Sequence, residues 1–455
     1  SLIAYRVSLI AYRVSLIAYR VSRIAYRVSR IAYRVSLIAY RVSRIAYRVS
    51  RIAYRISRIA YRKSPVASAL RFPQHEIRNT ESAIRIHPHC EVPMADLSVT
   101  IASLVLKNPV LPAAGPPVWN GEAMKACAAG GAGAIVSKTV SVRPAVVPTP
   151  NMAEIPGGFL NTELWSELPV EQFIEREYPL AKETGLPLII SIGYTAEEIA
   201  ELAPRVRPFA DALELSTHYI GDDPTPMVEA IRAAKAAVDV PVFVKLSPFR
   251  DMKTAARAAA EAGADGIVAI NSFGPCLGVD VETGRLLMGS REGYGWLSGP
   301  ALKPLALRCV FDIARTVDLP IIGVGGISKG TDAIEFFMVG ASAVGICTAA
   351  ILKGPRLFGK VAREIEKWLD DHGYASVEEV RGLAIRRWEE WTFRTTHVPP
   401  ILDVDTCTGC GLCEASCVYD AIHVVEKKAV LTPEKCYGCG LCITRCPVRA
   451  LSIAG

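Results

Sequence analysis

The sequence predicts an α/β protein: a (β/α)8 barrel, followed by a small cysteine-rich domain and preceded by a low-complexity repeat. Three observations predict this organisation. From residue 97 onward, short apolar runs rich in β-branched residues alternate with Ala-rich stretches of helical character. Eight of the 13 cysteines fall between residues 407 and 446. The first 63 residues are nine copies of one heptapeptide.

The repeat, Ser-(Leu/Arg)-Ile-Ala-Tyr-Arg-Val, explains the basic net charge of +7. Residues 1–63 hold 14 Arg, one Lys and no acid, so the remaining 392 residues carry 37 basic and 45 acidic side chains, a net of −8. A coiled coil with this seven-residue period would carry Arg on its flanks with no Glu to pair it. A β-strand is disfavoured as well, because an odd period turns each copy's apolar side chains to the opposite face. We interpret residues 1–63 as a non-functional extension. A basic nucleic-acid or membrane tail and an organelle-targeting segment are the alternatives.

The body of the chain looks like an intracellular protein. Residues 64–93 are Pro-rich and predict a linker, and we expect the native protein to begin at Met94. No run of 18 apolar residues predicts a transmembrane helix, and nothing resembles a secretory signal. Clustered cysteines indicate metal ligation in a reducing, cytoplasmic compartment. The acidic body argues against nucleic acid as a partner.

The barrel is predicted over residues 94–373. A hairpin at 97–107 precedes eight buried strands at residues 109–115, 134–139, 187–192, 212–217, 241–246, 266–271, 320–326 and 343–349. Helices are predicted between them at residues 122–129, 170–183, 226–237, 252–262, 300–316 and 331–339. Eight strand–helix units match a (β/α)8 barrel, whereas a doubly wound sheet usually has fewer.

Polar residues and glycines gather where these strands end, which is where barrels carry their function. Lys138 and Lys245 each end an apolar strand, although a buried Lys is costly unless it is paired. Either their aliphatic stems carry the ammonium groups to solvent at the rim of the barrel, or the ammonium groups face a bound anion or an electron-rich ring. Gly325-Gly326 and Thr348 follow the last two strands, where barrels commonly bind phosphate.

Several longer motifs occur in order over roughly residues 97–373: Lys107-Asn108-Pro109-Val110-Leu111-Pro112-Ala113, Ser137-Lys138-Thr139, Val244-Lys245-Leu246-Ser247-Pro248, Ala264-Asp265-Gly266, Ile270-Asn271-Ser272, Leu297-Ser298-Gly299-Pro300-Ala301-Leu302-Lys303-Pro304 and Ile322-Gly323-Val324-Gly325-Gly326-Ile327. With these motifs the sequence resembles a known family, the class 1 dihydroorotate dehydrogenases and the related dihydropyrimidine dehydrogenases.

The resemblance implies an FMN in the barrel mouth and a substrate beside it. It assigns to the cofactor Ala113, Ala114, Lys138, Thr139, Ser216, Lys245, Asn271, Ser298, Gly299, Gly325, Gly326, Cys347 and Thr348. It assigns Asn161, Asn271 and Ser272 to the substrate. The two lysines would contact the isoalloxazine, where a nearby cation stabilises the reduced, anionic flavin.

The sequence departs from the family at the end of the fourth strand. There the family has an Asn and then a Cys that moves a proton, but here Ser216 and Tyr219 stand at those positions. The flavin half of the site therefore matches, and the pyrimidine half matches only in part. We expect Tyr219 to be the proton partner, because a phenol can act as an acid toward a developing enolate. His218 is the second candidate and Cys276 the third. Lys138 completes the predicted catalytic group.

The C-terminal cysteines form two copies of a Cys-x2-Cys-x2-Cys-x3-Cys run, which is the spacing of bacterial two-cluster ferredoxins. One [4Fe-4S] cluster is expected on Cys407, Cys410, Cys413 and Cys446. The other is expected on Cys436, Cys439, Cys442 and Cys417. Zinc is the alternative, but eight cysteines at this period suit two cubes better than two tetrahedra. The ferredoxin domain is predicted over residues 403–455. Residues 374–402 join it to the barrel, and a connecting helix is predicted there over residues 377–393.

A ferredoxin domain fused to a flavin barrel resembles the catalytic subunit of bacterial NAD-dependent dihydropyrimidine dehydrogenase. We therefore expect an oxidoreductase that acts on a C–C bond next to a carbonyl, with a pocket that differs from the pyrimidine pattern. No dinucleotide motif is evident, so an FAD/NAD(P)H-binding subunit or a soluble ferredoxin is the expected partner. The resemblance leaves a homodimer and a hetero-oligomer open. The alternatives are true dihydropyrimidine or dihydroorotate chemistry with a Tyr or His donor, an electron-transfer subunit without turnover, and a scaffold or nucleic-acid binder built on the repeat.

Overall fold

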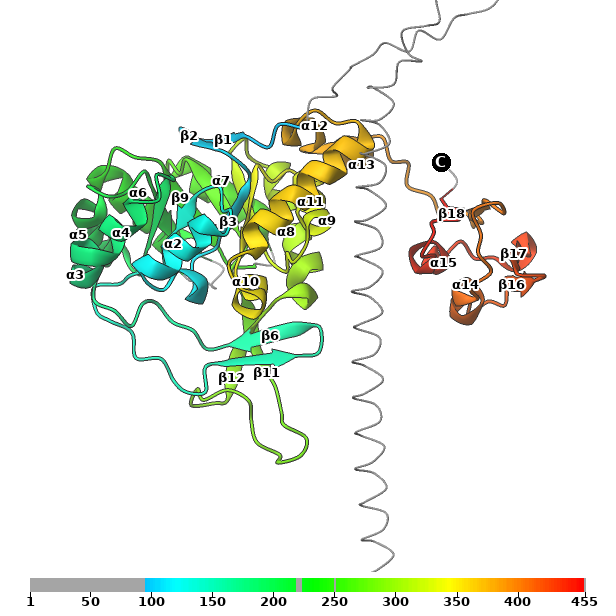
Figure 1. Ribbon diagram of the computed structural model, residues 1–455, viewed down its shortest axis with the longest axis horizontal. Helices are drawn as coiled ribbons and strands as arrows, with labels where there is room; N and C mark the ends of the chain where they lie inside the picture. The colour runs from blue at the N-terminus through cyan, green and yellow to red at the C-terminus, as the bar shows by residue number, and fades with distance from the viewer. Residues whose placement is uncertain (1–94, 218–222, 249–250, 454–455) are drawn as a thin grey trace, which may run out of the picture. The chain divides into compact units, whose positions relative to one another are not determined.

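The eight parallel strands that the sequence predicts form one sheet (Figure 1). A computed structural model describes residues 95–217, 223–248 and 251–453, so the repeat, the linker and Met94 lie outside the described residues. The sheet order is β3-β14-β13-β10-β9-β8-β7-β4, and an N–H···O bond of 2.8 Å joins Gly133, two residues before β4, to Val110 of β3 at the other edge. The strands are β3 (Val110–Pro112), β4 (Ile135–Val136), β7 (Leu188–Ile192), β8 (Ala212–Leu215), β9 (Val242–Leu246), β10 (Gly266–Ala269), β13 (Ile321–Val324) and β14 (Ala343–Ile346). The barrel is confirmed.

Helices cover the outside of this sheet, and several begin at side-chain caps. Asn120 accepts an N–H bond from Ala123, Thr195 forms a capping box with Glu198, and Asp251 accepts two N–H bonds. The helices are α2 (Gly121–Ala129), α3 (Val170–Gln172), a π-helical turn (Phe173–Glu177), α4 (Tyr178–Lys182), α5 (Ala196–Val206), α6 (Thr225–Ala237), α7 (Met252–Glu261), α8 (Lys303–Ala314), α9 (Gly330–Met338), α10 (Thr348–Lys353) and α11 (Leu357–His372), with 3-10 turns at Pro116–Val118 and Pro300–Leu302.

Side chains alternate between the barrel interior and the helical layer, as the period of two in a strand requires. On β9, Val242 and Val244 belong to the outer core, whereas Phe243 belongs to the interior cluster. The predicted N-terminal hairpin is confirmed as β1 (Val99–Ile101) and β2 (Leu104–Leu106). Its buried side chains join the interior cluster, so the hairpin fills the barrel at the amino ends of the strands and leaves the carboxyl ends for function.

A second, antiparallel sheet was not predicted. It has the order β11-β12-β6-β5, with β5 (Met152–Ile155), β6 (Gly158–Asn161), β11 (Phe273–Leu277) and β12 (Tyr294–Ser298). Its strands come from the chain between β4 and β7 and between β10 and α8. They are short and several are half exposed, so their hydrophobic pattern is weak. Asn161 and Ser298 lie on this sheet.

The single connecting helix expected over residues 377–393 is wrong. The chain forms α12 (Val377–Val380) and α13 (Leu383–Glu389), because Gly382 adopts a left-handed conformation with φ of 72°. Trp388 on α13 contacts the barrel: its ring lies 5.8 Å from that of Phe311 and 3.6 Å from the Arg315 guanidinium. Within the described ranges, no helix is both long and apolar enough to cross a membrane.

The C-terminal domain contains two similar halves. In each, a short helix follows a glycine with φ of 77°: α14 (Leu412–Ser416) after Gly411 and α15 (Leu441–Arg445) after Gly440. The other elements are β15 (Ile401–Leu402), β16 (Ile422–Val425), β17 (Lys428–Leu431), a 3-10 turn at Pro433–Lys435 and β18 (Leu451–Ser452). A small core of one Cys and three aliphatic side chains holds the two halves together.

Candidate active site

A cavity of about 360 Å³ opens at the carboxyl ends of the barrel strands. This volume is typical of small-molecule sites. All the side chains and glycines that the family resemblance assigns to the cofactor line it, and so do Asn161 and Ser272. Residues that are up to 235 positions apart in the sequence, from Ala113 to Thr348, thus meet in one cavity.

The same alternation that fills the barrel places charged groups at its top. Lys138 lies two residues after Val136, and Lys245 two residues after Phe243, so both point inward. The Lys138 ammonium bonds Glu163 and Glu167, each at 2.8 Å, and its side chain is only 4% exposed. Lys245 is 6% exposed. Neither lysine carries its ammonium group out to solvent at the barrel rim, because each side chain is buried and paired with a carboxylate.

The partner of Lys245 is a buried acid on the neighbouring strand. Glu214 is 2% exposed, and its Oε1 lies 3.6 Å from the Lys245 ammonium. The same oxygen accepts a hydrogen bond of 3.0 Å from the Ser191 hydroxyl, which lies 2.8 Å from the Thr139 hydroxyl. A chain of polar groups therefore crosses three strands below the cavity. The sequence shows Glu214 as an acid within an apolar strand, but sequence reasoning assigned it no role.

The cavity lining also contains a backbone cradle. Gly326 has φ of 75°, and a Cβ added there would lie 2.7 Å from the Gly299 oxygen. The Thr348 hydroxyl bonds the Ser298 hydroxyl at 2.8 Å beside it. Because no Cβ fills this space, a phosphate could come close to the backbone N–H groups that bind it. A cavity that combines two buried lysines with a glycine cradle fits FMN.

A buried carboxylate supports the loop that leaves this cradle. Asp332 accepts N–H bonds from Ser328 at 2.9 Å and Lys329 at 3.2 Å, and an ammonium bond from Lys303 at 2.8 Å. Burial alone would raise the pKa of Asp332, but the Lys303 ammonium and the Ser328 N–H bond outweigh it and hold the pKa below its usual value. The ionised side chain therefore stabilises the turn between the glycines and α9.

Cys347 lines the cavity as a neutral thiol. Burial raises its pKa to about 11, and Lys245, Glu163 and Lys138 act on it in smaller and partly opposing ways. A Cβ added to Gly115 would lie only 2.8 Å from the Cys347 sulfur. Since a thiolate is the nucleophilic form, Cys347 is suited to packing against a cofactor rather than to covalent chemistry.

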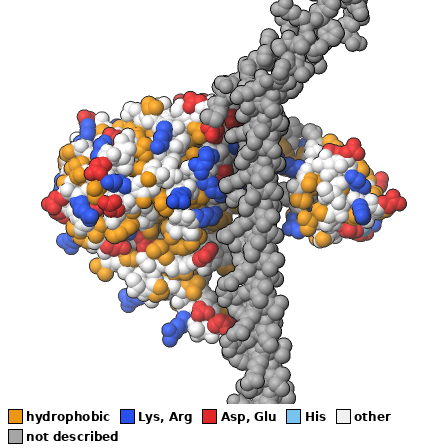
Figure 2. Space-filling view, viewed as in Figure 1, with side chains coloured by type: hydrophobic (Ala, Val, Ile, Leu, Met, Phe, Trp, Pro, Cys, Tyr) orange, Lys and Arg blue, Asp and Glu red, His pale blue; other side chains and the backbone are white. Residues whose placement is uncertain are grey.

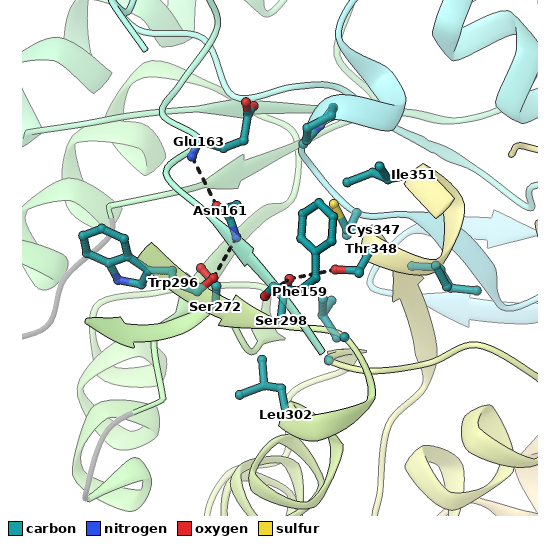
Figure 3. Close-up of a pocket in the computed structure, with 18 of the residues that line it drawn as sticks. Phe159, Asn161, Glu163, Ser272, Trp296, Ser298, Leu302, Cys347, Thr348 and Ile351 are labelled. Carbon is teal, nitrogen blue, oxygen red and sulfur yellow. Dashed lines mark hydrogen bonds between the residues drawn. The ribbon is translucent and has the colours of Figure 1, made fainter. Parts of the chain in front are cut away.

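The wall of the cavity that carries Asn161, one of the residues that the resemblance assigns to the substrate, is formed by the antiparallel sheet (Figure 3). The Asn161 side chain donates to the Trp296 carbonyl at 3.1 Å and accepts from the Glu163 N–H at 3.2 Å. The Asn271 oxygen accepts from the Ser272 N–H at 2.9 Å. Sequence reasoning missed Phe159 and Glu163, although their spacing of two around Asn161 is the signal of one strand face.

The structure describes only one of the three predicted proton partners. His218 and Tyr219 lie outside the described residues, and Ser216, which precedes them, lines the cavity. Cys276 lies on β11, where its thiol is 3.6 Å from the Phe273 oxygen, and it is not among the described residues that line the cavity.

Four of the eight cysteines of the C-terminal domain line a second, smaller cavity: Cys407, Cys410, Cys413 and Cys446. Backbone N–H groups donate to four sulfurs at 3.2–3.4 Å, those of Cys407, Cys417, Cys436 and Cys446. N–H bonds from Ala429 and Gly409 lower the pKa of Cys407. In the part of the chain that the structure describes, no three His, Cys, Asp or Glu residues could hold a single metal ion. Three cysteines of the first run and the last cysteine of the second run line this one cavity, which fits the ligand set of a [4Fe-4S] cluster.

Comparisons with known proteins agree with both sites. Residues 96–369 match the family model described as dihydroorotate dehydrogenase, and residues 406–450 match that of the 4Fe-4S dicluster domain. Three similar curated proteins each carry the name dihydroorotate dehydrogenase B (NAD(+)), catalytic subunit. The relative from Methanothermobacter thermautotrophicus is 39% identical over 301 residues, covering 63% of this chain and 98% of the relative. The one from Methanocella arvoryzae is 39% identical over 304 residues, covering 64% and 98%. The one from Pyrococcus abyssi is 36% identical over 303 residues, covering 64% and 99%.

Proposed function

The chain belongs to the dihydroorotate dehydrogenase family of FMN-dependent oxidoreductases that act on CH–CH groups, and on this premise we propose the reaction of its site. The protein adds or removes two hydrogens across a C–C bond next to a carbonyl. The observation that carries this proposal is one cavity that is lined both by two buried lysines and by a glycine cradle. FMN, when bound, supplies hydride transfer and can exchange electrons singly with the clusters.

The chain's own residues bind and orient the reactants. Lys138 and Lys245 hold the ring, while Gly299, Gly326 and Thr348 hold the phosphate. The preorganised ion pairs behind the lysines keep their ammonium groups in place, so little reorganisation accompanies the reaction.

The substrate carbonyl is held by the amides of Asn161 and Asn271 and by Ser272. Tyr219 moves the proton, with His218 next in order. Tyr219→Phe is expected to lose most turnover and keep FMN, as measured by steady-state rates and flavin content. Near-normal turnover of this variant together with an inactive His218→Ala would reassign the proton to His218.

The C-terminal domain holds two [4Fe-4S] clusters that relay electrons one at a time. The cavity between Cys407, Cys410, Cys413 and Cys446 supports the crossed ligand set, in which each run contributes three thiolates to one cluster and its last thiolate to the other. The electrons pass to or from an FAD/NAD(P)H-binding subunit or a ferredoxin. Thiolate ligands need a reducing environment, which favours a cytoplasmic location.

Two observations bear on the alternative functions. The names of the relatives favour dihydroorotate as a second candidate substrate. A role in nucleic-acid binding finds no support from the barrel, since Lys, Arg, Asp and Glu side chains are mixed across the described face that Figure 2 shows.

The test is to reduce the holoenzyme anaerobically and mix it with uracil, thymine, orotate and conjugated enoyl compounds. Reoxidation of the flavin by an enoyl compound but not by pyrimidines is expected. Reoxidation by orotate or uracil would instead assign true dihydroorotate or dihydropyrimidine chemistry. Purified protein without FMN would favour an electron-transfer subunit and refute the proposal.

A further inference from the structure

Glu163 is a carboxylate in the wall of the cavity that carries Asn161. Phe159, Asn161 and Glu163 are spaced two apart along and just beyond β6, and all three line the cavity (Figure 3). The Glu163 side chain is 12% exposed. Its Oε1 accepts from the Asn151 amide and its Oε2 from the Lys138 ammonium, so its position is held from two directions.

Among the described residues near Glu163, each buried ammonium is already paired with a carboxylate. Lys138 bonds two carboxylates at the same distance, so its charge is fully matched, and the second of them, Glu167, is half exposed and screened by water. Lys245 is matched by Glu214, and that pair is neutral. Glu154 adds a further acid to the cavity lining. Another lysine of the lining, Lys353, is exposed at the last residue of α10, the helix that starts at the predicted phosphate end.

We propose that Glu163 makes the site selective for an uncharged conjugated carbonyl compound and excludes one with a carboxylate beside the reacting bond. This inference rests on the proposed function and names its substrate class. A carboxylate bound near Asn161 would face the Glu163 carboxylate in a partly buried site, where a like charge a few ångströms away lowers affinity about tenfold or more. A neutral compound meets no such repulsion and can form hydrogen bonds with the side-chain amides of Asn161 and Asn271.

The experiment compares ligands that differ only in a carboxylate: uracil with orotate, and cyclohexenone with its ring carboxylate. Binding to oxidised holoenzyme is followed by the perturbation of the flavin spectrum, and reaction by the reoxidation of reduced enzyme. In the unmodified protein the neutral member of a pair should bind at least about tenfold more tightly. Because Glu163 also positions Lys138, the readout is the ratio of the two dissociation constants, which Glu163→Gln should shift about tenfold in favour of the charged member. Glu163→Asp keeps the charge and should keep the discrimination.

Glu167→Gln is the matched control. Glu167 bonds the same Lys138 ammonium at the same distance, but it is 46% exposed and does not line the cavity. Water screens its charge, so this variant should change the discrimination less than about threefold. Equal effects of the two Gln variants would place the cause in Lys138 and overturn the inference. Tight binding of orotate to the unmodified protein would overturn it while leaving the proposed function intact. A flavin that responds to no compound of either charge would overturn both.

Discussion

Replacing Gly326 with alanine should weaken FMN binding without unfolding the barrel. Gly326 has φ of 75°, a conformation that costs a residue with a Cβ about 1 kcal/mol. The new Cβ would lie 2.7 Å from the Gly299 oxygen and 2.8 Å from the Lys303 Cβ. Real Cβ atoms do not approach backbone this closely, so the segment from Gly299 to Lys303 must move, which adds about 1–3 kcal/mol.

Gly157→Ala separates the two contributions. Gly157 also lines the cavity and has φ of 73°, but a Cβ there would meet nothing within 4 Å. It therefore carries the backbone strain without the clash. Since the clash displaces Gly299, a part of the cradle, FMN should bind Gly326→Ala about tenfold to a hundredfold more weakly than Gly157→Ala.

The assay is reconstitution of the apoprotein with FMN, followed by the quenching of flavin fluorescence. Circular dichroism of both variants checks that the barrel is folded. Equal FMN dissociation constants for the two variants, within about twofold, would refute the assignment of Gly326 to the phosphate cradle.

Three further predictions concern the supports around the sites. Asp332→Asn removes the carboxylate that caps α9 and should cost about 2–4 kcal/mol at pH 7 by denaturant unfolding. Because the folded-state pKa of Asp332 lies below its usual 3.8, the difference between this variant and the parent should shrink as pH falls below about 4 and persist at higher pH; a constant difference at acid pH would contradict this. The double variant Cys407→Ser with Cys446→Ser should keep about four of eight irons, because crossed ligation puts both thiolates on one cluster; loss of all iron would favour uncrossed ligation. Trp388→Ala removes the stack on Arg315 and should speed proteolysis of residues 374–402, measured against the rate of barrel cleavage, while leaving the flavin content unchanged.

The local periodicity of the sequence was enough to predict the barrel. A period of two in each strand sets which side chains face inward, and so it placed Lys138 and Lys245 at the top of the interior before any pairing was known. The cysteine spacing likewise predicted the second site, because three thiolates within seven residues can reach one cluster only through tight turns. Gly382 was the exception, since one left-handed glycine ended a helix whose pattern continued beyond it.

The sequence by itself therefore determined the architecture, the residues that meet in the barrel cavity, and the presence of an iron–sulfur domain. Only the tertiary structure decided which charges meet. Lys138 is paired with Glu163 and Glu167, which lie 25 and 29 residues away, through a sheet whose strands are too short and too exposed to be predicted. The pairing of distant residues depends on where loops fold back over the barrel, and no local pattern carries that information. The charge that this cavity offers its substrate is for that reason a property of the fold.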